Sequence, residues 1–363
     1  MNILYITNVP SPYRIEYFNI LSEYCSLTVV YEKKRSSERD INWVADASGD
    51  YNTFFLNGIS TGADSALSFE VIKYLQKDFD IIVICGISSP TEFIAIEYCK
   101  LHKIPFFFES DGGIAGSGKG IKEKVKRHLL TNAAGYFSTC SRHDQYYLTY
   151  GACSDKIYRY PFSSISTHDL LPGILPQEHK MKLRAKLGIR GEYIVLSIGQ
   201  FIYRKGFDIL IKAASKLPYF TFYIIGGEPT NEYLDLVESL RITNVHFESF
   251  KSKNDILQYY DAADLFVLPT REDIWGLVVN EAMARALPVI TTDNCNAGLE
   301  MVNDSKNGFI IPVNDPEALA IAIQNCFNMD RCSMGEAALK TAEQYTIEKM
   351  VLRHMEVFNT IVR

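Results

Sequence analysis

Two carboxylates, Asp273 and Glu281, flank a glycine and the start of a helical pattern in the stretch REDIWGLVVNEAMARALPVI, residues 271–290. Gly276 lets a ligand approach the backbone closely, and the N–H groups at the start of a helix attract phosphate. A carboxylate within the helix can accept hydrogen bonds from both hydroxyls of a vicinal diol. The stretch therefore predicts a site for a ligand that carries phosphate and a diol, with Asp273 reaching another part of that ligand.

A more ordinary explanation of Glu281 is an ion pair with Arg285 on the surface of the same helix. Such a pair, four residues apart, contributes only about 0.2–0.5 kcal/mol to the stability of a helix. Glu281 lies off the apolar stripe of this helix, so its carboxylate is available for either role. The stripe consists of Val279, Ala282, Met283 and Ala286.

A second stretch, SIGQFIYRKGFDILIKA (197–213), runs from an apolar strand through a loop into a helix expected to start near Phe207. Arg204 and Lys205 precede this helix start. Each charge-assisted hydrogen bond to a phosphate contributes roughly 1.5–3 kcal/mol, against roughly 0.3–1 kcal/mol from the helix dipole. The two side chains would therefore dominate anion binding. Taken alone, however, a motif this short more often marks an exposed basic pair.

The elements that must position these residues alternate between apolar runs of strand length and helical patterns along the whole chain. This alternation predicts parallel sheets covered by helices on both faces, and the strand pattern restarts at YIVLSIG (193–199). The stretch 161–180 is rich in Pro, Ser and Gly and is interpreted as an interdomain linker and hinge. We therefore expect an α/β protein with two doubly wound, Rossmann-like domains that face each other across a cleft.

Composition narrows the class of protein. The chain of 363 residues is 47% hydrophobic and has a net charge of −6, which is typical of a soluble globular protein and does not favour nucleic-acid binding. MNILYIT at the start is a strand pattern rather than an export signal, and no apolar run reaches the roughly 20 residues of a membrane span. The eight cysteines show no C-x-x-C spacing, which indicates reduced thiols in a cytoplasmic protein.

Three motifs in combination resemble the family-four glycosyltransferases, which have the GT-B fold and retain the anomeric configuration. The motifs are GQFIYRKG, YYDAADLFVLPT and DIWGLVVNEAMARALPVI, and the resemblance covers roughly residues 190–330. It implies an acceptor-binding domain at 1–170, a nucleotide-sugar-binding domain at 171–345 and a terminal helix at 346–363 that crosses back to the first domain. Ile347, Val351, Met355 and Phe358, continuing to Ile361, form the apolar face of that helix.

Carried onto this sequence, the resemblance implies that Lys205 contacts the donor diphosphate, Glu281 the ribose hydroxyls and Asp273 the donor sugar. Two positions depart from the family pattern. Gln200 stands where the family has an arginine, and Asp273 stands where the family has the longer glutamate. Arg204 is the candidate for supplying the lost charge. The other donor-side residues that the resemblance implies are Gly199, Gly227, Phe250, Lys251, Ile274, Trp275, Gly276, Leu277 and Val278.

The first half should hold the acceptor. Pro12, Tyr13 and Arg14 follow the first strand, and Glu109 and Asp111 end the strand pattern IPFFFESDGG. Carboxylates at a strand's carboxyl end can accept a proton from an acceptor or bond a sugar, and we assign Asp111 a catalytic role beside Lys205 and Asp273. The alternative for Asp111 is a cap on the following turn.

The stretch KGIKEKVKRHLL (119–130) combines basic residues with Ile121, Val125 and Leu129 on one face. Such a helix suits the anionic inner face of a membrane, although a solvated helix face is the commoner reason for a basic run. We expect peripheral membrane contact here, because members of the family often use lipid-linked acceptors.

The reaction that these features predict is transfer of a sugar from a nucleoside-diphosphate sugar, UDP-sugar favoured over GDP-sugar, to a glycan or lipid-linked acceptor. Surface polysaccharide or glycoconjugate assembly is the expected setting. No cofactor or metal is expected, since the seven histidines lack metal-ligand spacing and no D-x-D pair follows a strand. The group that accepts the proton stays open.

Other classes of protein share parts of this outline. A dinucleotide oxidoreductase would need G-x-G-x-x-G after a first strand, and neither half has it. A two-lobed solute-binding protein should carry an export signal. A sugar-nucleotide epimerase of the same fold and a catalytically inactive partner subunit remain as alternatives, the latter because of Gln200 and Asp273.

Overall fold

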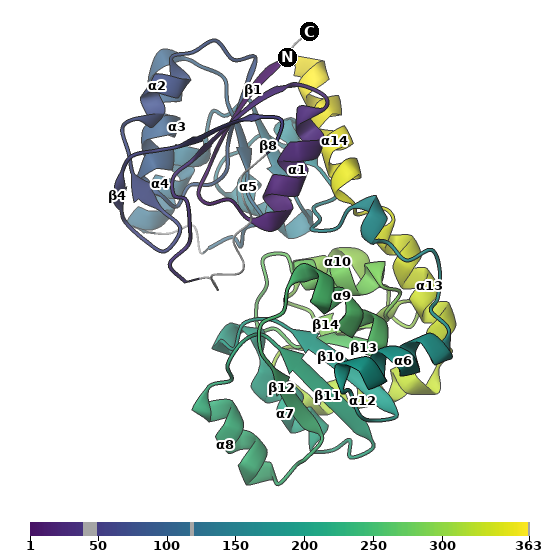
Figure 1. Ribbon diagram of the computed structural model, residues 1–363. Coiled ribbons are helices and arrows are strands. Elements are labelled where there is room, and N and C mark those ends of the chain that lie inside the picture. Colours follow the sequence, from purple (N-terminus) through teal and green to yellow (C-terminus); the bar gives the residue numbers. More distant parts are fainter. Residues whose placement is uncertain (39–48, 117–119, 362–363) are drawn as a thin grey trace. The chain divides into compact units, whose positions relative to one another are not determined.

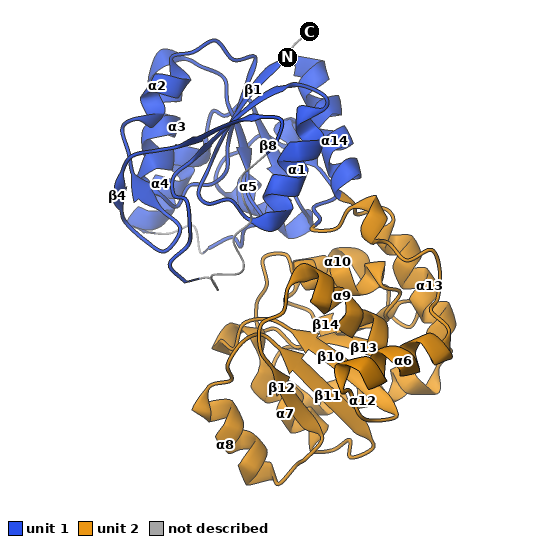
Figure 2. Ribbon diagram, viewed as in Figure 1, with its two compact units in different colours: residues 1–163, 347–363 blue, residues 164–346 orange. Residues whose placement is uncertain are grey.

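The computed structural model describes residues 1–38, 49–116 and 120–361, and it divides the chain into two compact units (Figures 1 and 2). Unit 1 comprises residues 1–163 and 347–363, and unit 2 comprises residues 164–346. The sequence placed this boundary near 170. It lies earlier because the segment after Ser163 bonds to unit 2: the Leu171 N–H donates to the Ala284 carbonyl at 3.0 Å, and Arg285 donates to the Asp169 carbonyl at 2.8 Å.

The stretch 161–180, interpreted from sequence as a linker and hinge, is largely a packed part of unit 2. Leu171 is 9% exposed and forms a small apolar cluster with Ala286 and Leu339. Leu170, Ile174 and Leu175 pack against the same cluster. Residues 170–175 therefore belong to the packed surface of unit 2.

Unit 1 is built on a seven-stranded sheet in which all pairings are parallel, in the order β3-β2-β1-β6-β7-β8-β9. The chain runs outward from β1 to β3 and then returns to the other side of β1, so the point where the order reverses lies between β1 and β6. The strands are β1 (Asn2–Thr7), β2 (Ser26–Tyr31), β3 (Asn52–Phe55), β6 (Ile81–Ile84), β7 (Phe107–Glu109), β8 (Gly135–Ser138) and β9 (Ile157–Arg159). A short antiparallel pair, β4 (Ile59–Ser60) and β5 (Ala66–Leu67), stands apart.

Alternate residues of the central strand face opposite layers of helices. Leu4 and Ile6 point into a core formed with β2, β6 and the helices at 71–75 and 90–102. Tyr5 points to the other face, where it meets Tyr17 and Phe18 of α1. The helices of unit 1 are α1 (Pro12–Ser22), α2 (Val71–Leu75), α3 (Pro90–His102), α4 (Ile121–Leu130), α5 (Ser141–Thr149) and α14 (Ile347–Ile361).

Unit 2 repeats this plan with a six-stranded parallel sheet in the order β12-β11-β10-β13-β14-β15. Its order reverses between β10 and β13. The strands are β10 (Tyr193–Ile198), β11 (Phe220–Ile225), β12 (Val245–Glu248), β13 (Leu265–Leu268), β14 (Val289–Thr292) and β15 (Gly308–Ile311). The helices are α6 (Gln177–Leu187), α7 (Phe207–Ala214), α8 (Asn231–Leu240), α9 (Lys253–Ala262), α10 (Leu277–Ala284), α11 (Asn296–Met301), α12 (Pro316–Asn328) and α13 (Arg331–Ala342). Among the described residues, no helix is long and apolar enough to cross a membrane.

The doubly wound α/β class predicted from the alternating pattern is confirmed in both units. The last helix, α14, lies in unit 1 and runs beside α1 (Figure 1). Val351 and Phe358 are fully buried, whereas Ile361 is 40% exposed, so the apolar face ends before that residue. Phe358 packs edge-on against Phe107 of β7 and Phe137 of β8, with ring centroids 5.8 and 5.5 Å apart.

Truncating Phe358 should therefore destabilise unit 1. Phe358→Ala is expected to lower its free energy of unfolding by about 3–5 kcal/mol, because a large ring leaves a cavity against the sheet. Leu352→Ala on the same helix is the control: Leu352 is 48% exposed, so a change within about 0.5 kcal/mol is expected. Chemical denaturation measures both, and equal losses would show that α14 does not contribute through its buried face.

Candidate functional site

Lys205 sits in a loop whose shape depends on a glycine. Residues Tyr203–Lys205 form a single 3₁₀ turn, and Gly206, at φ +69°, leads into α7. A Cβ atom on Gly206 would lie 2.1 Å from the Pro269 carbonyl oxygen, so no other residue fits without a shift of the backbone. The Arg204 carbonyl accepts hydrogen bonds from the Arg271 N–H at 2.8 Å and the Thr270 hydroxyl at 2.9 Å. The loop is thereby fixed against the segment that follows β13.

Asp273 lies in that segment and is held by both basic residues of the loop. Lys205 Nζ lies 2.6 Å from Asp273 Oδ2, and Arg204 Nη1 lies 3.4 Å from Oδ1. Asp273 is 7% exposed, and its own N–H donates to the Asn294 carbonyl at 3.0 Å. Two cations against one carboxylate leave an excess positive charge at the start of α7, which favours an anion. Arg204 thus contributes positive charge beside Asp273, whereas Gln200 is exposed.

Gly276 begins helix α10 at φ +106°, a conformation that favours glycine. The first N–H groups of a helix have no partner within it, so those near Leu277 and Val278 suit an anion. Trp275 was expected to contact the sugar donor, but this residue is only 2% exposed. Its indole N–H donates to Asn280 Oδ1 at 2.9 Å, so the ring links the loop to helix α10. Ile274 is 40% exposed beside it.

Glu281 does not form the ion pair with Arg285 that its spacing suggested. Arg285 instead forms two hydrogen bonds with Asp261, at 2.7 and 2.6 Å. Glu281 Oε1 accepts from the Ser164 hydroxyl and Oε2 from the Tyr260 hydroxyl, both at 3.0 Å. Burial raises the pKa of Glu281, and the hydrogen bonds from Tyr260 and Ser164 lower it in part. Each oxygen keeps lone-pair capacity for a further donor.

The remaining donor-side residues lie at the carboxyl ends of the unit 2 strands. Gly199 follows β10, and Gly227, at φ +112°, follows β11 with open space where a Cβ would be. Phe250 and Lys251 follow β12, where Lys251 Nζ lies 3.0 Å from Glu248. These positions match the edge at which open α/β sheets bind ligands.

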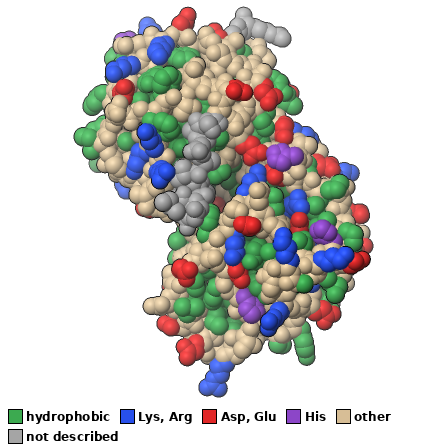
Figure 3. All heavy atoms as spheres, viewed as in Figure 1, with side chains coloured by type: hydrophobic (Ala, Val, Ile, Leu, Met, Phe, Trp, Pro, Cys, Tyr) green, Lys and Arg blue, Asp and Glu red, His purple; other side chains and the backbone are tan. Residues whose placement is uncertain are grey.

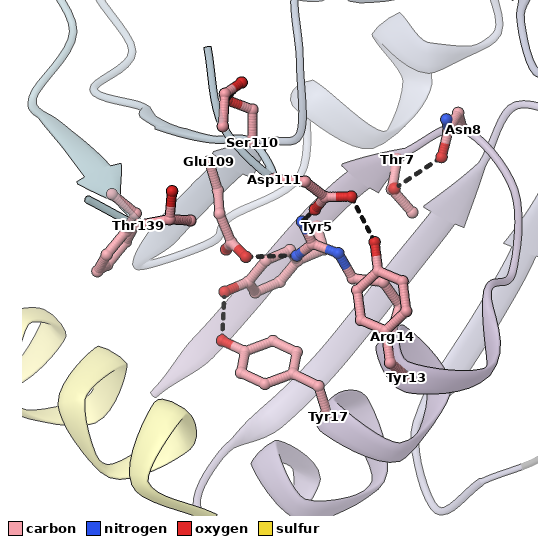
Figure 4. Close-up of polar contacts among 12 residues, drawn as sticks. Tyr5, Thr7, Asn8, Tyr13, Arg14, Tyr17, Glu109, Ser110, Asp111 and Thr139 are labelled. Atoms are coloured by element: carbon pink, nitrogen blue, oxygen red, sulfur yellow. Dashed lines mark hydrogen bonds and ion pairs between the residues drawn. The ribbon is translucent and has the colours of Figure 1, made fainter. Parts of the chain in front are cut away.

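The acceptor-side residues of unit 1 form one ion-paired cluster (Figure 4). Arg14, in the first turn of α1, donates through Nη1 to Glu109 Oε1 and through Nη2 to Asp111 Oδ1 at 2.8 Å. The Tyr13 hydroxyl donates to Asp111 Oδ2 at 2.6 Å. Pro12 opens the helix at a position where its missing N–H costs nothing. Asp111 is therefore held by side chains and does not act as a turn cap.

Exposure separates the members of this cluster. The side chain of Asp111 is 38% exposed, against 5% for Arg14 and none for Glu109. Glu109 and Arg14 were expected to face an acceptor, but the structure buries them behind Asp111. Burial raises the pKa of Glu109, and the Arg14 guanidinium and His354 outweigh it and lower that pKa to about 2. Glu109 is thus an ionised support, and Asp111 is the carboxylate that a ligand can reach.

Sequence reasoning missed several buried polar residues that lie beside these sites. Tyr260 belongs to the YYDAADLFVLPT motif, so the motif itself was a signal for it. His354 interrupts the apolar face of α14 and is fully buried, and a polar residue on such a face is a usable signal. His143 Nδ1 accepts from the Thr139 N–H at 3.2 Å while Nε2 meets Ser110 Oγ at 3.1 Å. Nothing in the local pattern distinguished Ser164 or His143.

Known proteins resemble the chain in sequence and in fold. Residues 179–342 match the family described as Glycosyl transferases group 1. An uncharacterized glycosyltransferase of Haemophilus influenzae is 30% identical over 187 residues, which cover 49% of this chain and 50% of that protein. The lipopolysaccharide glucosyltransferase WaaG of Escherichia coli is 31% identical over 157 residues, or 39% of this chain and 41% of that one. The chain thus spans half or less of the length of these curated relatives.

The structural likeness covers both units. HepE of Anabaena, in a crystal structure with UDP-glucose, superposes with a TM-score of 0.79 over 99% of this chain and 100% of that one. At 16% identity this likeness shows the fold alone. Residues 179–342 thus resemble the group 1 glycosyltransferase family, and the chain has the two-domain α/β fold, GT-B, of its structural neighbours.

Proposed function

We propose that the protein transfers a sugar from a nucleoside-diphosphate sugar to a glycan or lipid-linked acceptor with retention at the anomeric carbon. The observation that carries this proposal is the arrangement of Lys205, Asp273 and Glu281 in unit 2. Two cations stand at a helix start beside a fixed carboxylate, and a second carboxylate with spare acceptor capacity lies in the second turn of α10. Diphosphate, sugar and ribose diol are the three groups that such a set can bind.

The choice of donor rests on the relatives. HepE is a protein of the same fold whose structure contains UDP-glucose, and we propose a UDP-sugar in preference to a GDP-sugar here. WaaG is named for lipopolysaccharide glucosyl transfer, which supports a setting in surface polysaccharide or glycoconjugate assembly.

The chemical contribution of unit 2 would be to stabilise the departing nucleoside diphosphate. Lys205 and Arg204 offer N–H donors to phosphate oxygens, and each such charge-assisted bond contributes about 1.5–3 kcal/mol. Because Lys205 is already paired with Asp273 at 2.6 Å, it is held in place before the donor arrives. We propose that this cationic set works without a metal ion.

Asp111 is proposed as the acceptor-side carboxylate, because it is the exposed end of the unit 1 cluster. A carboxylate oriented by Arg14 and Tyr13 can accept a hydrogen bond from an acceptor hydroxyl.

Helix α4 is proposed as a peripheral membrane contact. Ile121 and Val125 are 82% and 42% exposed on a helix that also carries exposed Lys122 and Lys124. The face of unit 1 drawn in Figure 3 shows Lys and Arg side chains among hydrophobic ones. Lys119, part of the predicted basic stretch, lies outside the described residues.

The donor role of Lys205 can be tested by transfer assays with a panel of UDP- and GDP-hexoses and alkyl glycosides, with excess chelator present. Lys205→Ala should reduce transfer by about 100-fold or more, from roughly 3 kcal/mol of lost transition-state stabilisation. Lys212→Ala, on the neighbouring helix α7 and paired with Asp208, is the control and should be near normal. A wild type that neither transfers nor hydrolyses any donor would favour the inactive-subunit alternative. A product altered only in its sugar configuration would favour the epimerase.

The diol role of Glu281 predicts a dependence on its two hydroxyl partners. Tyr260→Phe and Ser164→Ala should each raise the pKa of Glu281 further, because each removes a hydrogen bond to the ionised form. Each should also weaken binding of UDP measured by calorimetry. Tyr259→Phe is the matched control, since the Tyr259 hydroxyl lies 3.3 Å from Glu248 instead. Unchanged UDP affinity in Tyr260→Phe and Ser164→Ala would count against the role.

The membrane proposal predicts that the protein sediments with anionic phosphatidylglycerol vesicles and much less with phosphatidylcholine vesicles. The double variant Ile121→Glu, Val125→Glu should lose most of this binding. Ile321→Glu, on α12 and 56% exposed, should keep it. Equal binding by both variants would show that α4 is merely a solvated basic helix.

A further inference from the structure

Behind Asp111 lies a buried series of charged and polar groups that the donor chemistry does not use. It runs from the solvent-accessible Asp111 through Arg14 and Glu109 to His354 on α14. Glu109 and His354 are both 0% exposed. We propose that Glu109 and His354 are positioning residues, which act through Arg14 to hold the Asp111 carboxylate in the orientation that transfer requires. This inference rests on the proposed function of Asp111.

The first step of the series depends on the shape of the guanidinium group. Arg14 uses Nη1 for Glu109 and Nη2 for Asp111, so its two terminal nitrogens bind two different carboxylates. A guanidinium is planar, and fixing one terminal nitrogen fixes the direction of the other. Glu109 therefore determines where Arg14 directs its second N–H group, and with it the position of Asp111.

The second step explains why Glu109 itself needs a partner. Its Oε1 accepts from Arg14, while its buried Oε2 and the buried Nε2 of His354 both lack a hydrogen-bond partner among the described residues. His354 Nε2 faces that oxygen at 3.3 Å. The other ring nitrogen, Nδ1, lies 2.8 Å from the Met350 carbonyl, which can only accept, so Nδ1 carries a hydrogen. When Nε2 also carries a hydrogen, the ring is an imidazolium, and its charge pairs with Glu109 Oε2 across that 3.3 Å contact.

The His354 ring is held rigidly enough to serve this purpose. Phe137 of β8 stacks on it with centroids 4.0 Å apart, and Tyr160 meets its edge at 4.7 Å. Tyr17 of α1 packs on it as well, at 5.3 Å. The ring is thus confined by β8, by the segment after β9 and by α1, and α14 supplies it.

A purely structural network is the competing explanation. Buried ion pairs are often no better for stability than apolar residues of similar size, so stability alone does not account for the series. The series also ends at a carboxylate that is 38% exposed. A network that served packing alone would have no reason to hold that last group from two directions, by Arg14 and by Tyr13.

The test uses full-length protein, with transfer from UDP-hexoses to alkyl glycosides as the readout. Glu109→Gln and His354→Leu should each lower kcat by roughly tenfold to 100-fold, because a small misplacement of a reacting group has effects of that size. The KM for the donor should change little. His354→Gln, whose amide N–H can donate to Glu109, should recover most of the rate. Met355→Leu, a buried control on the same helix, should be near normal.

A double-variant comparison separates positioning from loss of structure. In an Asp111→Asn background, Glu109→Gln and His354→Leu should lower the remaining rate by less than about twofold, since their effect runs through Asp111. Equal losses with and without Asp111→Asn would overturn the proposal. So would kcat values within about twofold of wild type for both single variants.

A spectroscopic readout keeps this test distinct from the test of the proposed function. If wild type transfers no sugar, the proposed function fails, but the Arg14 guanidinium can still be followed by ¹⁵N NMR. Two fixed carboxylates should prevent its rotation and give separate Nη signals in wild type and in Met355→Leu. These signals should merge or broaden in Glu109→Gln and His354→Leu. Unchanged signals in both variants would show that Glu109 and His354 do not position Arg14.

Discussion

The constraint on which both units depend is that a charged group taken out of water must meet a partner of opposite charge. In unit 1 the guanidinium of Arg14 is buried, and Glu109 and Asp111 compensate it. In unit 2 the carboxylate of Asp273 is buried, and Lys205 and Arg204 compensate it. Each pairing joins the loop after one strand to an element from elsewhere in its unit, so the requirement for compensation also shapes the candidate sites.

The geometry of unit 2 bears on both departures from the family pattern. The shorter side chain of Asp273 still reaches Lys205, because residues 204–206 and 269–273 are fixed against each other through the Arg204 carbonyl. Arg204 lies near the same carboxylate, whereas Gln200 is exposed. Arg204 thus places a positive charge on the same loop, four residues after Gln200. A glutamate at position 273 would be one methylene longer and would place its carboxylate elsewhere relative to Lys205.

Much of the fold could be predicted, because parallel strands buried on both faces are continuous apolar runs. NILYIT and YIVLSIG predict the strands β1 and β10, and each run is followed by the expected change to helical periodicity. The strand β3 was missed since its residues alternate between exposed and half-buried at the edge of the sheet. Strand β9 gives an equally weak sequence signal, because it has only three residues and no apolar run.

The candidate sites were predictable only where a motif carried them. Lys205, Asp273 and Glu281 stand in motifs whose spacing specifies loop and helix start, and the structure brings the first two together at 2.6 Å. The supports of each site come from distant segments: Ser164 is 117 residues from Glu281, and His354 reaches Glu109 from the last helix. Local periodicity contains no information about such pairings. It also could not show that Arg14 and Trp275 are buried, since both stand in loop-to-helix positions that are usually exposed.

The two candidate sites place their carboxylates in opposite electrostatic surroundings. Glu109 is buried among cationic partners, which hold its pKa at about 2 and keep it charged. Glu281 is held by neutral hydroxyls, so burial leaves its pKa raised. A permanently charged group suits a fixed support, because its interactions do not change with the ligand. A carboxylate with a raised pKa responds to its ligand instead, since each hydroxyl that donates to it favours the ionised form. Hydroxyl donors therefore favour the ionised form of Glu281, whereas Glu109 is kept ionised by the partners it already has.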